Sequence, residues 1–130
     1  MNQYEEQPRE GRIRQPLPTS GALLTFDIAE QVRRLTSEQP WQAEHTANTI
    51  VKYPDLRIVL VALKAGGRLQ EHRTAARISI HSLSGQIAVH VEEQLIEMSA
   101  GKLLTIDRDI SHEVEAKSDS VFLLTIAWPK

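Results

Sequence analysis

Cysteine is absent from the chain of 130 residues, which excludes disulfides, thiolate metal sites and a cysteine nucleophile. An absence of cysteine fits a reducing compartment. No apolar run approaches the ~20 residues that a membrane helix needs. The polar and acidic start, MNQYEEQ, holds no apolar core for a signal peptide. We therefore predict a cytoplasmic protein with no membrane partner.

Excess charge and aromatic residues are also lacking. The formal net charge is −2 and the pI is about 6.2, so nothing in the charge balance points to a nucleic-acid partner. Aromatic residues make up 5% of the chain, and this low content suits a narrow β-barrel filled by valine, isoleucine and leucine. The length is enough for one domain with a proper core, but not for two.

Residues 1–20 differ in composition from the rest of the chain. They contain Pro8, Pro16 and Pro18, several charges and almost no apolar periodicity. We interpret them as an N-terminal arm that is either flexible or laid across a partner subunit. Residues 21–130 then form the single domain.

A short amphipathic helix is predicted from Asp27 onwards. Asp27 and Glu30 have the spacing of a capping box, with aspartate in place of the usual serine or threonine. Ile28, Val32 and Leu35 follow at helical spacing. We expect this helix to cover an open end or an edge of a sheet.

A series of short strands, separated by turn signals, follows the helix. Leu56–Lys64 has the sequence LRIVLVALK, which is apolar on both faces and predicts a central strand. Gln86–Val91 alternates as a half-buried strand does. The other candidates are Thr46–Lys52, Ile78–Leu83, Gln94–Met98, Leu103–Ile106, His112–Ala116 and Val121–Trp128. About eight short strands without intervening helices predict a sandwich or a barrel.

Two stretches resemble the sequence motifs of the cupin family, which have the forms G-x5-H-x-H-x3,4-E-x6-G and G-x5-P-x-G-x2-H-x3-N. The positions of the first motif are occupied here by Gly66, His72, Thr74, Ile78 and Gly85. Those of the second are occupied by Gly101, Asp107, Asp109, His112 and Ala116. The resemblance implies an all-β fold, the cupin-type jelly-roll barrel (double-stranded β-helix), here with one short N-terminal helix.

The resemblance also implies a ligand set, because metal-binding cupins hold one divalent ion with three histidines and the glutamate of these motifs. His72 and His112 match this set, whereas Thr74 and Ile78 occupy the positions of the other histidine and the glutamate. A neutral hydroxyl is a poor ligand and isoleucine is none, so we predict that no metal is bound. The alternative is a divalent transition metal on His72 and His112, with Gln70 and waters.

The candidate ligand site lies where the histidines of the two motifs converge in the barrel. Strand alternation places Gln70, His72 and Thr74 on one face. The predicted polar contacts are His72, Thr74, Gln70 and His112, and the predicted apolar lining is Ile78, Ile80, Leu60 and Ile106. Such a mixture orients a small organic molecule while it buries the apolar body. The alternative is that both histidines are buried and satisfied by backbone groups.

Three functions are open at this point, and so is the question whether the protein is an enzyme. The first is a small-molecule-binding cupin of unassigned substrate, without a bound metal. The second is a metal-dependent cupin enzyme, a dioxygenase or isomerase, with an incomplete site based on His72 and His112. The third is a structural or regulatory dimerisation module. Exposed barrel edges and the apolar outer face of Leu56–Lys64 predict a homodimer.

Overall fold

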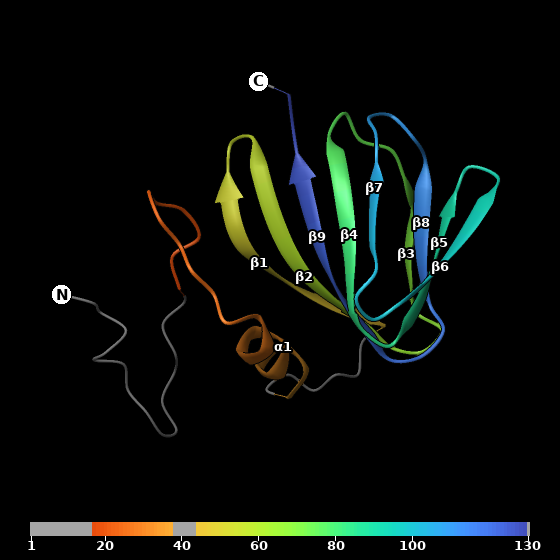
Figure 1. Ribbon diagram of the computed structural model, residues 1–130, viewed down its shortest axis with the longest axis horizontal. Helices are drawn as coiled ribbons and strands as arrows, with labels where there is room; N and C mark the ends of the chain where they lie inside the picture. The colour runs from red at the N-terminus through yellow and green to blue at the C-terminus, as the bar shows by residue number, and fades with distance from the viewer. Residues whose placement is uncertain (1–16, 38–43, 130) are drawn as a thin grey trace.

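The described residues, 17–37 and 44–129, form one helix and nine strands in the computed structural model (Figure 1). The elements are α1 (Ile28–Ser37), β1 (His45–Tyr53), β2 (Leu56–Leu63), β3 (Arg68–His72), β4 (Arg77–Ser84), β5 (Gln86–Val91), β6 (Gln94–Ser99), β7 (Leu103–Ile106), β8 (His112–Ala116) and β9 (Ser120–Ala127). The side chains of Glu71 and His72 lie outside the described residues. No described helix is long and apolar enough to cross a membrane. The cytoplasmic location stays a prediction.

The nine strands form two antiparallel sheets that face each other (Figure 1). The five-stranded sheet has the order β1-β2-β9-β4-β7, and the four-stranded sheet has the order β3-β8-β5-β6. Strands far apart in the chain are neighbours, as with β2 and β9, which is how a jelly roll is connected. The predicted all-β jelly roll with one short helix is therefore confirmed.

The core fills the space between the two sheets with aliphatic side chains and one phenylalanine, as the low aromatic content predicted. Phe122 from β9 and Ile87 and Val89 from β5 are each fully buried, at 0% exposure. The complete cluster of buried residues is Val61, Leu63, Ile78, Ile80, Ile87, Val89, Met98, Ile106, Val114, Ala116 and Phe122. Both sheets contribute to it, so neither can form a stable half without the other.

The helix α1 begins where the sequence predicts and covers the outer face of the five-stranded sheet. The side chain of Asp27 caps it, since the backbone N–H of Glu30 donates to Asp27 Oδ1 at 3.2 Å. Leu35 packs in a second cluster with Leu60, Ala62 and Val121, which come from β2 and β9. The helix therefore lies over a sheet face rather than over an open end.

The place of Leu60 corrects a prediction, because Leu60 does not line the barrel. It is 0% exposed and packs beneath α1 on the outside of β2, while Val61 and Leu63 face the interior. Strand β2 is apolar on both faces, so its sequence gave no indication of which residues would point inwards.

Strand β3 was not among the predicted strands, and a bulge interrupts it. Leu69 pairs with Val114 and His72 with His112, so β3 uses one residue more than β8 over this interval. The bulge interrupts the regular alternation on which the predicted common face of Gln70, His72 and Thr74 depends, and the shared face itself stays a prediction. Leu69 is the residue that packs on the core, and Thr74 lies beyond the end of β3.

Of the predicted arm, residues 17–20 are described, and they lie beside the edge strand β1. The backbone N–H of Lys52 donates to the carbonyl of Thr19 at 2.8 Å. One residue further on, the hydroxyl of Tyr53 donates to the carbonyl of Gly21 at 2.5 Å. Residues 1–16 lie outside the described residues, so the arm as a whole stays a prediction.

Candidate functional site

The backbones of the two motif histidines are brought together on neighbouring strands. Strands β3 and β8 pair antiparallel, with His72 directly opposite His112. His112 is the first residue of β8 and His72 the last of β3, so both lie at the same end of the four-stranded sheet. The sequence prediction that these positions are adjacent is consistent with this register, and the side chain of His72 lies outside the described residues.

The imidazole of His112 is buried and held in one orientation. The residue is 4% exposed, and its Nδ1 lies 3.0 Å from the carbonyl oxygen of Ile110. A carbonyl oxygen can only accept, so Nδ1 is the donor in this contact. This backbone contact is the one expected of a structural histidine, and it also fixes the orientation of the ring.

A small cavity in the barrel interior adjoins His112. Its volume is about 20 Å³, and it is lined by Leu69, Gln70, Ile80, His112, Val114, Phe122 and Leu124. A cavity needs roughly 10–15 Å³ of this kind to hold one water molecule. The described residues thus leave room for a water, with Gln70 and His112 as its polar walls. A larger ligand needs further space at the end of β3.

Thr74 and Ile78, the other two motif positions, do not extend this polar wall. Thr74 lies in a turn, where its side-chain hydroxyl accepts a hydrogen bond from the backbone N–H of Ala76 at 3.3 Å. Its backbone carbonyl accepts a second hydrogen bond, from the backbone N–H of Asp109 at 2.8 Å. Ile78 is 5% exposed and belongs to the core cluster, paired with Ile106 and Ile126 on the neighbouring strands.

The described residues do not fit the divalent metal that the fold family implies. Buried isoleucine at position 78 offers no donor, and the Thr74 hydroxyl is already hydrogen-bonded within its turn. Among the described side chains, which do not include those of Glu71 and His72, no three His, Asp or Glu gather as a metal site needs. His112 and Gln70 are the described polar side chains at this place, and neither carries the negative charge that offsets a divalent ion.

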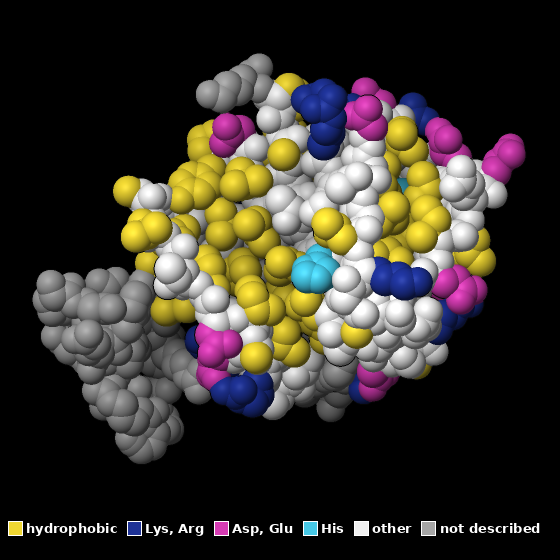
Figure 2. Space-filling view, viewed as in Figure 1, with side chains coloured by type: hydrophobic (Ala, Val, Ile, Leu, Met, Phe, Trp, Pro, Cys, Tyr) yellow, Lys and Arg dark blue, Asp and Glu magenta, His cyan; other side chains and the backbone are white. Residues whose placement is uncertain are grey.

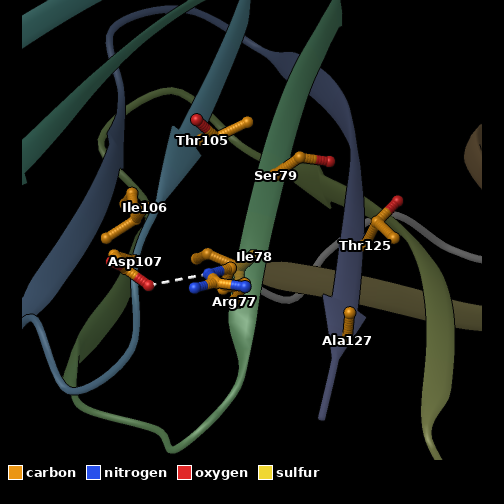
Figure 3. Close-up of a pocket in the computed structure, with 8 residues that line it drawn as sticks. All are labelled: Arg77, Ile78, Ser79, Thr105, Ile106, Asp107, Thr125 and Ala127. Carbon is orange, nitrogen blue, oxygen red and sulfur yellow. Dashed lines mark hydrogen bonds and ion pairs between the residues drawn. The ribbon is translucent and has the colours of Figure 1, made fainter. Parts of the chain in front are cut away.

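A larger groove lies on the outer face of the five-stranded sheet, at the ends of β4, β7 and β9 (Figure 3). Its volume is about 500 Å³, within the range of ligand pockets. Ser79 pairs with both Thr105 and Thr125, so three hydroxyls stand in a row across adjacent strands. Sequence reasoning missed this groove, because three polar residues on separate strands form no motif.

An ion pair closes one end of the groove. Arg77 Nε lies 2.8 Å from Asp107 Oδ1, and the backbone N–H of Arg108 donates to the same oxygen at 2.7 Å. The hydrogen bond from Arg108, and after it the Arg77 side chain, hold the pKa of the Asp107 carboxyl below its ordinary value. Asp107 occupies the position where the second cupin motif has proline. Its ion pair with Arg77 connects the end of β7 to the start of β4.

Together, these features define a class of protein, a small β jelly roll with a buried histidine at the start of a strand that lines its interior. The chain belongs to the cupin family, because the family's Cupin domain matches residues 59–128. The resemblance inferred from the motifs is therefore confirmed. No curated protein matches the chain.

Several solved structures have the same fold. A conserved protein of unknown function from Streptococcus pyogenes has a TM-score of 0.70 and 19% identity, over 92% of this chain and 99% of that one. A cupin superfamily protein from Desulfitobacterium hafniense has a TM-score of 0.67 and 13% identity, over 70% of this chain and 84% of that one. A predicted oxalate decarboxylase from Thermotoga maritima has a TM-score of 0.62 and 18% identity, over 65% of this chain and 81% of that one. At such identities, the likeness concerns the fold alone.

Proposed function

We propose that this cupin domain binds a small organic molecule in its barrel, beside His112 and without a bound metal. The supporting observation is the oriented imidazole of His112 at a cavity that Gln70 also reaches. A ring held in one orientation suits a ligand that places a polar group against it. His72, which pairs directly opposite His112, is the further polar contact of the proposed site, whereas the Thr74 hydroxyl is engaged in its own turn.

The walls of the cavity indicate what kind of molecule fits. Ile80, Phe122 and Leu124 are apolar, whereas His112 and Gln70 are the only polar residues that line it among those described. A ligand with an apolar body and one or two polar groups matches this composition. Since the cavity has room for little more than a water, we expect the end of β3 to move when such a ligand binds.

The absence of metal from the proposed site rests on the chemistry of Thr74 and Ile78. A metal-dependent dioxygenase or isomerase is the alternative, and the neighbours include one predicted decarboxylase as well as proteins of unknown function. That alternative requires donors that these two positions do not provide.

The proposal can be tested with a library of small organic fragments that carry one hydroxyl or amine donor on an apolar body. We expect some fragments to raise the melting temperature of the protein and to shift the imidazole resonances of His112. His112→Leu should weaken their binding by about tenfold or more, because a buried hydrogen bond is lost.

The matched control is His81→Leu, since His81 lies on the outer face of β4, between the buried residues Ile80 and Ser82. Fragments that bind wild type and His112→Leu equally well contradict the proposed site. If no fragment binds and His112→Leu costs about 2–3 kcal/mol or more, His112 is a structural core histidine instead.

A second proposed role, assembly into a two-fold homodimer, is supported by the difference between the two outer sheet faces. The outer face of the four-stranded sheet carries ion pairs, such as Arg68 with Glu113 and Lys117 with Glu115. The outer face of the five-stranded sheet is largely apolar (Figure 2), and Leu103 on its edge strand is 65% exposed. Large apolar patches on a surface mark contact sites, and a second copy of this chain is the proposed occupant.

We expect Leu103→Asp to shift the protein from dimer to monomer in sedimentation velocity at tens of micromolar, because it places a charge in the proposed interface. Leu95→Asp is the matched control, since Leu95 is 52% exposed on the opposite sheet. A wild-type protein that is purely monomeric at this concentration contradicts the proposed dimer.

A further inference from the structure

Arg57 lies on the interior side of β2, one step beyond the cavity beside His112. In β9, Leu124 lines this cavity, and Ile126 follows on the same side of the strand and packs on the core. Arg57 is the partner of Ile126, as Val59 is of Leu124, in a pairing of β2 with β9 that has no bulge. Because paired residues share a face, the side chain of Arg57 is directed to the interior, at the end of the barrel where β2 begins.

The guanidinium of Arg57 is held in place, but one of its donors lacks an acceptor. Its Cζ lies 5.2 Å from the centre of the Trp128 ring, which is a cation–π contact. Such a contact uses the face of the guanidinium and leaves the N–H groups at its edge available to donate. The Nε of Arg57 is buried and has no hydrogen-bond partner in the described part of the chain.

Arg108 has the same property at the same end of the barrel. One row of paired residues crosses β2, β9, β4 and β7, and it consists of Arg57, Ile126, Ile78 and Ile106. Arg108 follows two residues after Ile106, in the loop between β7 and β8. The turn before β2 and this loop both lie at the top of Figure 1. The Nε of Arg108 is likewise buried, without a hydrogen-bond partner among the residues described.

The charges of these two arginines are also not paired. Arg77 begins β4 at the same end, but it points to the outer face and forms its ion pair with Asp107. Within residues 17–37 and 44–129, no carboxylate forms an ion pair with Arg57 or Arg108. A buried N–H donor without an acceptor is unfavourable, and a bound anion would supply both the acceptor and the counter-charge.

We propose that the small molecule bound beside His112 carries a carboxylate, which accepts hydrogen bonds from the Nε–H groups of Arg57 and Arg108. This inference rests on the proposed function and adds the chemical class of the ligand to it. The planar edge of a guanidinium matches the two oxygens of a carboxylate. Leu124 and Ile126, on the interior side of β9, give the apolar body of the ligand its contact surface.

Hexanoate and the uncharged hexanamide are a matched pair of probes, because they differ only in the head group. Each is titrated into the full chain and followed by the Nε–Hε resonances of Arg57 and Arg108 in ¹H–¹⁵N NMR spectra. We expect saturable shifts with hexanoate and at least tenfold weaker binding of hexanamide. Arg57→Gln and Arg108→Gln should each weaken hexanoate by tenfold or more and leave hexanamide unchanged.

Two further variants separate a specific contact from a general effect of charge. Arg57→Lys keeps the charge and the stack on Trp128 but lacks the Nε donor, so it should also weaken hexanoate. Arg77→Gln is the matched control, since Arg77 lies at the same end of the barrel on the outer face, and it should bind hexanoate like wild type. The inference is overturned if hexanoate shifts do not saturate, if hexanamide binds as tightly, or if Arg77→Gln loses as much affinity as Arg57→Gln.

Failure of this inference is distinguishable from failure of the proposed function. Hexanamide that binds as tightly as hexanoate, and more weakly in His112→Leu, would overturn the carboxylate but support the barrel site. Hexanoate binding that depends on the two arginines but not on His112 would contradict the proposed function, and with it the common site.

Discussion

Gly85→Ala is expected to destabilise the domain by more than about 3 kcal/mol, a loss large enough to prevent folding in many small domains. Gly85 joins β4 to β5 and has a φ of 83°, which favours glycine. A Cβ there would lie 2.3 Å from Ser120 Oγ and 2.4 Å from the Asp119 carbonyl oxygen. The same Ser120 hydroxyl accepts from Gln86 N and donates to Gln86 O. The substitution therefore breaks the contact between the two sheets as well as straining the turn.

Gly101→Ala is the matched control, because it has the conformational strain without the collision. Gly101 has a φ of 93°, and an added Cβ would meet nothing within 4 Å. Its expected cost is that of the left-handed backbone alone, about 1–2 kcal/mol. Urea unfolding of both variants gives the comparison. Equal losses at the two positions would contradict the role given to the Gly85–Ser120 contact.

Thr74→His combined with Ile78→Glu is expected to create a divalent metal site that wild type lacks. Since Ile78 is 5% exposed, Ile78→Glu alone should cost about 3 kcal/mol or more by burying an unpaired carboxyl group. In the double variant, Mn²⁺ or Ni²⁺ should restore much of this loss, because a metal that binds only the folded state stabilises it. The melting temperature with and without each ion is the measurement.

The matched control for the metal experiment is Thr74→His combined with Ile80→Glu. Ile80 is 1% exposed and lies two residues further along the same strand, on the same side, but at no ligand position of the motif. We expect the same loss of stability without rescue by metal. Rescue of both double variants, or of neither, would mean that positions 74, 78 and 112 do not stand in the register of a cupin metal site.

Sequence patterns were sufficient for eight of the nine described strands and for the family. Gln86–Val91, Leu103–Ile106 and His112–Ala116 have the predicted bounds, because alternating apolar residues between turn signals carry this information locally. Arg68–His72 was missed, since Leu69 is its only apolar residue. Leu60 was placed on the wrong face, because a strand apolar on both sides does not indicate which side is the interior.

The sites depended on contacts between distant segments, so less of them could be predicted. The outer groove combines residues from three strands that have no common sequence signal. The bulge in β3 is also invisible in the pattern. The burial of Gln31 did leave a signal, because Gln31 lies three residues after Ile28 and four before Leu35, on the apolar side of the helix.

The metal content of purified wild-type protein is the most direct test of the metal-free barrel. Elemental analysis after purification without added metal or chelator should find well under one equivalent of zinc, iron, manganese, nickel or copper per chain, because Thr74 and Ile78 leave the motif without two ligands. A near-stoichiometric content of one of these metals, lost in His112→Ala, would contradict the proposed function and would favour the metal-dependent enzyme.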